Sequence, residues 1–516
     1  MRTPYPLTAL ALLLTLAAVA RAAEPSTFSI ADFGAVSDGK ALNTDAIAKA
    51  IDAAAQAGGG IVKVPSGKWL TGAIELKSHI TLFLDNGATL LMSTNPADYP
   101  VVFTRWEGIE CYNYSGLIYA SNADHIAITG KGAIDGQGQA WWRWAKSAGP
   151  AQRMLRNLGE TVNNPKDRLF GTPRDALRPN LIQFIHCEDV LLEGVTVKNS
   201  PMWTIHPIYC ERVICRDLYL FSQGPNTDGI DPDSCKNVLI EKCTIDSGDD
   251  CIAIKSGRDN DGRRVNTPCE NIVIRDCHLH RGRGGIAIGS ETAGGIRNIT
   301  AIHCGMRGTT RGIRIKTMRG RGGIVEDINL SDIKLLDILE TAIDIDMQYN
   351  PTDPKPFDIT TPTLRNITLR DITCDGAKQA ALLRGLDESP IQNLTIKNAN
   401  FKTDKSISAE QLVKTKLENI EVTNLKSGPA LLADHVADWT LDKFKTPRAP
   451  RSDPLLIFKS ATDVTIKNTN APTHTNVYLQ LSGPETKNVT LINCDTYAAR
   501  QKFEMSEDVP TDAVIE

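Results

Sequence analysis

The phrase Asn237-Val-Leu-Ile-Glu-Lys-Cys243 returns as Asn271-Ile-Val-Ile-Arg-Asp-Cys277 and again as Asn298-Ile-Thr-Ala-Ile-His-Cys304. Each copy begins with Asn and then alternates apolar with polar side chains, which is the pattern of a half-buried β-strand. Further copies, some of them weaker, open at His79, His125, Asp189, Arg212, Asp327, Asn366, Asn393, Asn419, Asp463 and Asn488. One strand pattern therefore recurs along most of the chain.

The spacing of these copies predicts the fold. From residue 189 onward the intervals are 23, 25, 34, 27, 29, 39, 27, 26, 44 and 25 residues, a repeat period with loops of varying length inserted. Such a short strand can form its backbone hydrogen bonds by pairing with the strand of the next copy. We therefore expect an all-β solenoid, a right-handed parallel β-helix. A leucine-rich solenoid would show a leucine ladder, and a propeller would repeat at about 40 to 50 residues.

The cysteines fit this repeat as apolar residues. Cys243, Cys277, Cys304 and Cys494 take the place that other copies give to Val195, Leu218, Ile333, Ile372, Ala399 and Leu425. We therefore expect them to be unpaired in an internal stack. No Cys-x-x-Cys or His-x-x-x-His spacing occurs, so no metal site is expected. The glycosylation sequons lie at the turn position and are interpreted as turn residues: Asn298, Asn366, Asn393 and Asn488.

The two ends of the chain differ from the repeat. Residues 1–22 combine Arg2, a short apolar run and small residues around Arg21, which predicts a secretory signal peptide and export to the periplasm or the medium. Residues 23–75 are expected to form an N-terminal cap leading into the solenoid, with a short helix that begins near Asn43 and Thr44. The β-helix should occupy residues 76–500, with a long loop at 135–179, and residues 501–516 should be a tail.

The composition excludes several classes of partner. The 516 residues are 41% hydrophobic and 23% charged, which is typical of a globular protein with a large core. A net charge of -4 and an aromatic content of 6% argue against nucleic acid. After the signal peptide no apolar run reaches the about 18 residues that span a bilayer. We therefore expect no nucleic-acid partner, no membrane association after signal cleavage, and a monomer.

Aspartates gather in two successive repeats. Asp228 ends the triplet Asn226-Thr-Asp, and Asp249-Asp250 follows about one coil later. Stacked coils lie roughly 4.8 Å apart, so these carboxylates should converge on one wall if the chain bends at Gly248. Carboxylates at such short distances repel one another when all are ionised. One should therefore hold a proton while the others stay charged, which supplies a general acid and a general base. The alternative is that they are ordinary turn aspartates, as in the helix-capping triplet at residues 43–45.

Cations follow in the next two coils. Arg283 lies in a glycine-rich segment, Arg314 and Lys316 share one face of a strand, and Lys255 and Arg258 follow the aspartate pair. A local positive cluster beside acidic residues, in a chain of negative net charge, would suit a substrate that carries a carboxylate. Salt bridges between coils are the alternative interpretation of each single residue.

Four ordered motifs carry a resemblance to a known family: Asn226-Thr-Asp228, Gly248-Asp249-Asp250, Gly282-x-Gly284-Gly285 with Ile288-Gly289-Ser290-Glu291, and Arg314-Ile-Lys316. They resemble the motifs of glycoside hydrolase family 28, the polygalacturonases. The likeness extends through residues 28–34, 132–136 and 200–207 and so covers most of the mature chain.

The resemblance implies an inverting hydrolase that cleaves α-1,4 bonds between galacturonate units of pectin without a cofactor. Asp249 would be the general acid, and Asp228 and Asp250 would activate the attacking water. Arg314 and Lys316 would bind the galacturonate carboxylate of an acidic plant polysaccharide or oligogalacturonide. The remaining substrate-binding candidates are Asn226, Lys255, Arg283, Tyr349 and His206.

Two features leave alternatives open. Arg283 stands where the third motif of polygalacturonases usually has His, so a rhamnogalacturonan hydrolase of the same family is the alternative substrate class. The resemblance also implies a disulfide between Cys251 and Cys277, whereas the repeat places Cys277 in the internal stack.

The excursion at residues 135–179 bears on the mode of attack. It is polar, contains three tryptophans and is long enough to cross a groove, so we expect exo-hydrolysis from the non-reducing end, with mono- or disaccharide released. An endo-enzyme results if the loop covers only the flank. A β-helical lyase, using residues 259–262 as a calcium loop, and a non-catalytic binding β-helix are weaker alternatives. A serine hydrolase is excluded because no Gly-x-Ser-x-Gly occurs.

Overall fold

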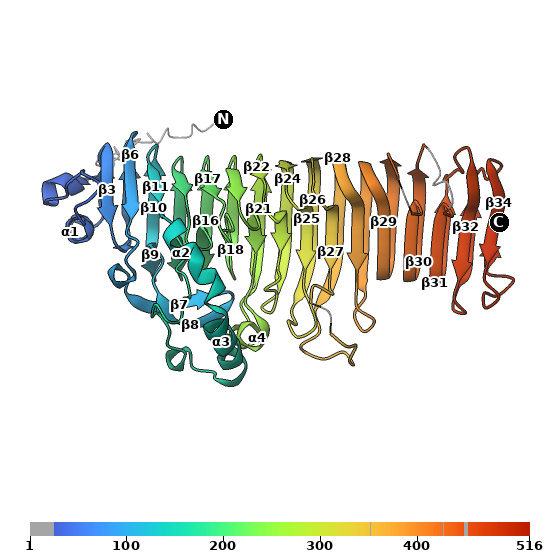
Figure 1. Cartoon of the computed structure of the whole chain (residues 1–516), viewed down its shortest axis with the longest axis horizontal. Coiled ribbons are helices and arrows are strands. Elements are labelled where there is room, and N and C mark those ends of the chain that lie inside the picture. Colours follow the sequence, from blue (N-terminus) through green and yellow to red (C-terminus); the bar gives the residue numbers. More distant parts are fainter. Residues whose placement is uncertain (1–24, 351, 427, 448–452, 516) are drawn as a thin grey trace, which may run out of the picture.

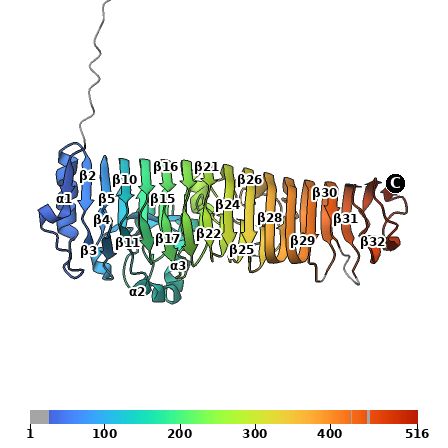
Figure 2. The ribbon, with the colours of Figure 1, turned by 90° about the horizontal axis from the view of Figure 1, so that it is seen from above.

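The computed structural model describes residues 25–350, 352–426, 428–447 and 453–515. The predicted signal peptide, residues 1–22, lies outside them. The described chain forms a long rod in which successive coils stack from the N-terminal to the C-terminal end (Figure 1, Figure 2). Apart from one antiparallel hairpin and a single antiparallel bridge, every strand pairing is parallel, and the right-handed β-helix is confirmed.

Each full coil contributes a strand to each of three faces. The first face pairs β1 (Thr27–Ser29), β2 (Gly60–Val64), β5 (Ile80–Leu84), β10 (Asp124–Gly130), β13 (Glu188–Glu193), β16 (Glu211–Arg216), β18 (Lys236–Glu241), β21 (Cys269–Arg275), β24 (Ile296–Arg307), β26 (Ile324–Leu336), β28 (Thr363–Arg384), β29 (Ile391–Thr423), β30 (Leu431–Lys445), β31 (Leu456–Lys467), β33 (Lys487–Ile492) and β35 (Val514–Ile515).

The second face contains β3 (Gly67–Thr71), β6 (Ala88–Met92), β11 (Ala133–Asp135), β14 (Thr196–Lys198), β17 (Tyr219–Ser222), β19 (Thr244–Ser247) and β22 (His278–His280). β22 then pairs with β24, a longer strand that belongs to both the first and the second face. The third face contains β4 (Ile74–Glu75), β9 (Ile118–Ser121), β12 (Ile182–Ile185), β15 (Ile205–Ile208), β20 (Ile252–Ile254), β23 (Gly284–Ile288), β25 (Arg311–Lys316) and β27 (Thr341–Asp346). Single bridges through Ile230 join β15 to β20. β32 (Thr475–Ser482) and β34 (Ala499–Met505) extend the stack from β31.

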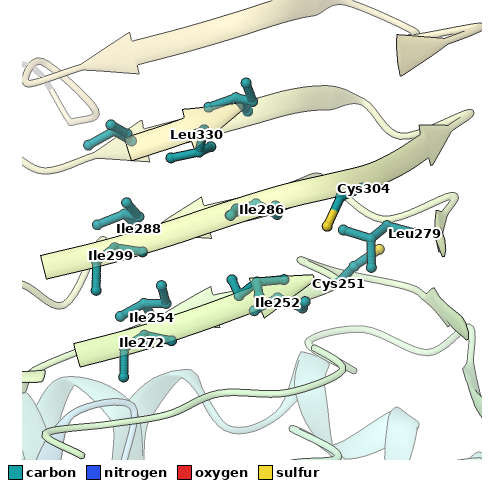
Figure 3. Packing of buried hydrophobic residues seen from close by; sticks show 14 of the residues in the cluster. Cys251, Ile252, Ile254, Ile272, Leu279, Ile286, Ile288, Ile299, Cys304 and Leu330 are labelled. Atoms are coloured by element: carbon teal, nitrogen blue, oxygen red, sulfur yellow. The ribbon is translucent and has the colours of Figure 1, made fainter. Parts of the chain in front are cut away.

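The interior consists of apolar side chains stacked in register. On the first face Val238, Ile272, Ile299, Ile328, Ile367 and Leu394 succeed one another, as the repeated phrase predicts. On the third face Ile252 pairs with Ile286 and Ile254 with Ile288, and Figure 3 shows these side chains in the same core. Because like side chains lie over like, each coil packs against its neighbours with little exposed apolar surface between them.

The residues that open the repeat adopt a left-handed backbone. Asn237, Asn271 and Asn298 have φ values of 58°, 59° and 57°, a conformation that Asn tolerates better than most residues. Their side chains form a ladder, in which Asn271 Nδ2 donates to Asn237 Oδ1 at 2.9 Å and Asn298 Nδ2 to Asn271 Oδ1 at 2.7 Å. The turn interpretation of these asparagines is confirmed.

One copy was assigned to the wrong corner. Asn419 Nδ2 donates to Asn398 Oδ1 at 3.0 Å, and Asn398 in turn donates to Asp371, so Asn419 belongs to the corner after the first face. The first corner is the turn just before the first face, where Asn237, Asn271 and Asn298 lie. It continues through Lys414 and Asp438 to Asp463, since Thr415 pairs with Trp439 and Trp439 with Val464. The interval of 44 residues was an artefact of mixing two corners that share one sequence pattern.

The cysteine stack is confirmed with one change. The registers place Cys243, Cys277 and Cys304 in adjacent coils, followed by Ile333, Ile372 and Ala399. Leu425 was wrongly included, because it was counted from Asn419. All twelve cysteines lie among the described residues, and all are free, so the disulfide between Cys251 and Cys277 is absent from this structure.

The predicted boundaries differ from the structure at both ends. The helix α1 (Thr44–Gln56) is present, but the side chain of its N-cap residue Asn43 makes no capping bond and donates to Leu70 O at 3.0 Å. β1, β2 and β3 already belong to the sheet, so the solenoid begins before residue 76. β34 and β35 continue it beyond residue 500, where a tail was expected. Among the described residues no helix is long and apolar enough to cross a membrane.

Two insertions leave the solenoid on the same side of the third face. The antiparallel hairpin of β7 (Val101–Trp106) and β8 (Ile109–Tyr114) was not predicted. The long loop contains α2 (Gln139–Trp142) and α3 (Gly149–Thr161), and α3 packs against β8 and α4 (Asp259–Val265). Short 3-10 turns lie at η1 (Ile30–Phe33), η2 (Pro96–Asp98), η3 (Arg143–Lys146) and η4 (Pro165–Asp167). Figure 1 shows the hairpin, α3 and α4 grouped along one edge of the rod.

Candidate active site

A small polar cleft lies over the third face, between the insertions and the loops that follow β23 and β27. It has a volume of about 190 Å³. Ala253 on β20 and Ala287 on β23 are in register with Arg314 on β25. All three residues alternate with inward-facing isoleucines, so their side chains point to the cleft side. The two alanines leave space there that larger side chains would fill.

Nine of the ten predicted site residues line this cleft: Asn226, Asp228, Asp249, Asp250, Lys255, Arg283, Arg314, Lys316 and Tyr349. They come from loops and strand ends of five successive coils. Glu107, Arg156, Trp203, Arg258, Ser290 and Glu291 complete the lining.

The three aspartates converge as predicted. One carboxylate oxygen from each of Asp228, Asp249 and Asp250 lies within 4.8 Å of the other two. Adjacent residues can share the cleft because residues 248–251 are not a strand, and the chain bends tightly there. A Cβ on Gly248 would lie 2.2 Å from the carbonyl oxygen of Gly224, so the bend requires glycine.

Cations distinguish Asp250 from its neighbours. Lys316 Nζ lies 2.6 Å from Asp250 Oδ2, and Arg314 Nη1 lies 3.4 Å from Asp250 Oδ1. Burial alone would raise the pKa of Asp250, yet Lys316 and Arg314 hold it below its usual value. Asp250 is therefore a carboxylate at neutral pH.

The other two aspartates behave in the opposite way. Burial, followed by the charge of Asp249, raises the pKa of Asp228 to about 8. Burial, followed by the charge of Asp250, also raises the pKa of Asp249. Since their carboxylate oxygens lie within 4.8 Å of each other, the two groups share a proton, and the cluster offers a proton donor beside a fixed carboxylate. Asp249 is the most exposed of the three, at 9%, so it is the donor that a ligand can reach.

Lys255 is one of the residues that line the cleft, but it is only 3% exposed. Its Nζ is 3.4 Å from Glu291, 3.5 Å from Asp231 and 3.6 Å from Asp228, and it lies over the Trp203 ring. Burial alone would lower the pKa of Lys255, but Glu291, Asp228 and Asp231 hold it well above its usual value. Lys255 is thus a buried counter-charge, a role that the sequence interpretation as a substrate contact did not include.

Asp231 is a fourth aspartate that sequence reasoning missed. It is fully buried, and neither of its carboxylate oxygens accepts a conventional hydrogen bond. Burial, followed by the charge of Asp228, raises the pKa of Asp231 well above its usual value. A neutral carboxylic acid satisfies these surroundings, since its hydroxyl can donate to Asp228.

Arg283 and Tyr349 form the exposed part of the cleft. Arg283 Nε lies 3.7 Å from Asp249 Oδ2, and its side chain is 67% exposed. The Tyr349 ring lies 5.4 Å from the Arg314 guanidinium and 5.5 Å from Lys316 Nζ. Both residues can therefore contact a ligand that enters the cleft.

Asn226 is held by the long loop. Arg178, at the end of that loop, donates from Nη2 to Asn226 Oδ1 at 2.7 Å and from Nη1 to Pro225 O at 2.6 Å. Because the amide oxygen of Asn226 is occupied by Arg178, its NH2 group remains for a ligand.

His206 does not line the cleft. It is fully buried behind Trp203, with its Nε2 3.4 Å from Asp233 Oδ2 and its Nδ1 2.9 Å from Asn180 Nδ2. Burial lowers its pKa, so it is neutral. The prediction of a substrate contact is not supported here, because the β7–β8 hairpin, absent from the sequence prediction, covers this part of the third face.

The insertions supply a network on one side of the cleft. Glu107, at the hairpin turn, lies 3.1 Å from Arg258 Nη1 and 3.2 Å from Arg156 Nη2 of α3. Arg258 also approaches Glu291 at 3.6 Å. The sequence signal for these residues was weak, since only the position of Arg258 beside Lys255 pointed to the site.

The three aspartates could in principle hold a cation. Their oxygens are close enough, but Lys316 and Arg314 already compensate Asp250, and Lys255 lies beside Asp228. These ammonium and guanidinium groups already supply positive charge beside the carboxylates, which a metal ion would have to add to. The residues therefore fit proton transfer better than metal binding.

Comparisons with known proteins bear on the family of the chain. Residues 171–420 match the family model described as glycosyl hydrolases family 28, and residues 27–95 match rhamnogalacturonase A/epimerase, pectate lyase-like. A probable polygalacturonase of Vitis vinifera is 35% identical over 391 residues, covering 72% of this chain and 74% of the relative.

Two further relatives differ in their mode of attack. An exopolygalacturonase of Thermotoga maritima has a solved structure that is 37% identical, with a TM-score of 0.74, covering 77% of this chain and 93% of that one. An endo-polygalacturonase of Pectobacterium carotovorum is 29% identical, covering 70% of this chain and 85% of the relative.

Proposed function

Because the chain belongs to glycosyl hydrolase family 28, we propose that it hydrolyses the α-1,4 bond between galacturonate units by single displacement at the three-aspartate cluster. One observation carries this proposal. Asp249 and Asp228 have raised pKa values beside the ionised Asp250, and Arg314 and Lys316 adjoin the same carboxylate.

Asp249 is the proposed general acid. Its raised pKa favours the protonated form of the carboxyl group, and its exposure allows contact with the glycosidic oxygen. The proton passes from Asp249 to that oxygen as the bond to the anomeric carbon breaks. The leaving sugar departs as an alcohol, and Asp249 becomes a carboxylate.

Water is the proposed nucleophile. Both oxygens of Asp250 face a cation, and Asp250 and Asp228 are more deeply buried than Asp249, so neither is placed for direct attack on a sugar carbon. A water bound between Asp228 and Asp250 can lose its proton to the Asp250 carboxylate as it attacks, which inverts the anomeric centre. The oxygens lie within 4.8 Å of one another, closer than the roughly 6.5–9.5 Å between carboxyl groups of most inverting enzymes, so the proposed attack by water rests on the burial of Asp228 and Asp250.

Arg314 and Lys316 are the proposed contacts of the galacturonate carboxylate. Arg314 offers a planar pair of donors, Lys316 offers a point charge, and Tyr349 covers both. Six cations line the cleft against five carboxylates: Arg156, Lys255, Arg258, Arg283, Arg314 and Lys316 against Glu107, Asp228, Asp249, Asp250 and Glu291. The cleft is therefore positive even with every carboxylate ionised, and a proton on the aspartates makes it more so, as an anionic sugar requires.

We also propose exo-attack from the non-reducing end. The hairpin and α3 bring Glu107 and Arg156 to one side of the cleft, where a long polymer would otherwise continue. The 37% identical structure is an exopolygalacturonase, which agrees with this mode. The product is mono- or disaccharide.

The test is product analysis on polygalacturonate. We expect reducing ends to accumulate while viscosity falls slowly, and NMR of the first product to show the inverted anomer. A steep early loss of viscosity with a ladder of oligomers would reject exo-attack. Retained configuration would reject single displacement, and unsaturated products would indicate a lyase.

Rhamnogalacturonan hydrolysis is a second candidate. It rests on Arg283, which replaces the usual His of the third motif, and on the match of residues 27–95 to the rhamnogalacturonase A/epimerase model. The two substrates can be compared directly by kcat/KM. We expect polygalacturonate to be preferred, because the paired cations at Arg314 and Lys316 fit a run of acidic sugars.

We also propose that the protein is exported and that it is a monomer. The proposal of export rests on the signal-peptide pattern of residues 1–22 and on a substrate that is a plant cell-wall polymer. Cell fractionation with N-terminal sequencing of the mature protein, followed by size-exclusion chromatography, tests both parts.

A further inference from the structure

The first corner of the β-helix changes its chemistry towards the N-terminal end. The register Thr81 to Ala127 on β5 and β10 places His79 and His125 at the corner position that Asn237 and Asn271 occupy in later coils. His79 and His125 have φ values of 61° and 52°, so they share the left-handed turn of that ladder. Where later coils stack amides, these two coils stack imidazoles.

The two imidazoles and one carboxylate converge. The ring centroids of His79 and His125 are 5.1 Å apart. Asp124 Oδ2 lies 2.9 Å from His125 Nδ1 and 3.5 Å from His79 Nε2. One donor atom from each of the three residues lies within 4.8 Å of the other two.

We propose that His79, Asp124 and His125 form a binding site for a divalent transition-metal ion of the zinc type. Bonds of about 2.0–2.2 Å in tetrahedral geometry place neighbouring ligand atoms roughly 3.3 Å apart. The 2.9 and 3.5 Å separations bracket that value. The side chains are 45% to 60% exposed, so they can adjust, and water can supply the fourth ligand.

The ligand set selects the class of metal. Two imidazoles with one carboxylate suit Zn²⁺, Ni²⁺ or Cu²⁺, whereas Ca²⁺ and Mg²⁺ prefer oxygen ligands throughout. Hydrogen bonding from Ser78, followed by that from His125, lowers the pKa of Asp124, so it is available as a carboxylate.

A neighbouring carboxylate lies near the outer nitrogen of one ligand. Asp189 Oδ2 is 3.6 Å from His125 Nε2, and Arg212 holds Asp189 through Nε at 2.6 Å. A hydrogen bond from Nε2 to Asp189 would need only a small shift, and it would leave Nδ1 as the nitrogen that faces a metal. Nδ1 of His125 already faces Asp124 at 2.9 Å.

The site would clamp two coils without touching the cleft. His79 precedes β5 and His125 lies on β10, so a shared ion links successive coils near the N-terminal end. None of the three residues lines the cleft. Binding to the folded state alone raises stability by mass action, and hydrolysis should be unaffected.

His303 is a matched control within the same protein. It is also an exposed histidine in a left-handed turn, with Asp332 at 3.3 Å and Asp276 at 3.7 Å, but no second imidazole lies beside it. Its side chain is 55% exposed, like those of the proposed ligands.

The experiment titrates ZnCl2 into the mature chain, prepared without a polyhistidine tag, by calorimetry. We expect one saturable site and a rise in Tm with Zn²⁺. His79→Gln and His125→Gln should each weaken binding by tenfold or more, and His303→Gln should leave it unchanged. Co²⁺ should give the visible absorption of a low-symmetry, four-coordinate ion that disappears in both ligand variants.

Two results would overturn the proposal. One is the absence of saturable Zn²⁺ binding to the wild-type chain. The other is an equal loss of affinity in His303→Gln, which would indicate general surface binding. Circular dichroism of each variant confirms that it is folded, and the Co²⁺ spectrum separates ligand loss from a change in stability.

Discussion

The coils around the cleft and the C-terminal coils share one architecture, and one row of outward side chains distinguishes them. Along the third face an outward row runs in register through Ala253, Ala287, Arg314, Asp344, Leu382, Ser408, Leu432, Ile457 and Gln480. At the cleft this row supplies small and charged residues, whereas from Leu382 to Gln480 it supplies no charge. The scaffold is therefore constant, and the chemistry depends on which side chains it carries outward.

The chain also changes how it turns the corners. β28, β29 and β30 run for 22, 33 and 15 residues and pass corners without a break. Around the cleft, β19, β20 and β22 have only 4, 3 and 3 residues, and loops carry the chain between them. Because the strands end early here, the backbone between them can bend, and this bend places Asp249 and Asp250 side by side.

The largest expected effect is on the proposed acid. Asp249→Asn removes the transferable proton and should lower kcat by about 10²–10⁴-fold, the range for acid–base catalysis, with Tm nearly unchanged. Steady-state kinetics on polygalacturonate measures this. Turnover close to wild type would show that Asp249 is not the acid.

A pair of core substitutions tests whether the scaffold is equivalent in both regions. Ile286 and Ile407 occupy the same inward row of the third face and are buried. Ile286→Ala and Ile407→Ala should each lower the free energy of unfolding by about 2–5 kcal/mol, since each leaves a similar cavity. Denaturant titration measures the cost, and only Ile286→Ala, under the cleft, should also lower kcat. A similar loss of kcat in Ile407→Ala would mean that the C-terminal coils contribute to catalysis.

The outward row can be tested in the same way. Arg314→Ala should raise KM for acidic oligogalacturonides by about 10–100-fold, because a charge-assisted contact of roughly 1.5–3 kcal/mol is lost. Leu382→Ala, in the same row, should leave KM unchanged. Reduced-carboxyl oligomers provide the neutral control, and an equal loss on both substrates would contradict a carboxylate contact.

The pH profile should respond to Lys316. In the proposed mechanism Asp250 is ionised, and its pKa is held down, so activity should persist as pH falls until Asp250 takes up a proton. In the same mechanism Asp249 is protonated, and its pKa is raised, so activity should be lost as pH rises through that pKa. Lys316→Met removes a cation that lowers the pKa of Asp250, and the acidic limb of kcat should move to higher pH. An unmoved acidic limb would separate that limb from Asp250.

The smallest effect is expected at Asp231. If it is a neutral acid that donates to Asp228, Asp231→Asn keeps a donor and should alter kcat by less than about tenfold. Asp231→Leu removes the donor and should shift the pH profile. A large loss in Asp231→Asn would show that Asp231 works as a carboxylate that balances Lys255.

The repeat was sufficient to predict the scaffold. Alternation of side chains and the left-handed tolerance of Asn are local properties, so the first face and the cysteine stack could be inferred from sequence. The error at Asn419 has the same origin, because both corners use the same Asn signal, and only the hydrogen bond to Asn398 tells them apart.

The site was predictable where one coil stacks on the next. Asp228, Asp249, Asp250, Arg314 and Lys316 lie close together because coil spacing brings equivalent positions into contact. His206 could not be placed in this way, since its burial depends on the hairpin that folds back over the third face.

The sequence by itself determined the coil: which side chains point inward, where the chain turns, and which carboxylates meet across one coil spacing. These follow from periodicity, which acts over a few residues. Only the tertiary structure decided what covers the coils. It placed Glu107 and Arg156 at the cleft, set Lys255 beside Asp228 and gave Asp250 and Asp228 opposite pKa shifts. Insertions carry no period, and a pKa depends on charges and burial from distant segments, so neither can be inferred from local sequence.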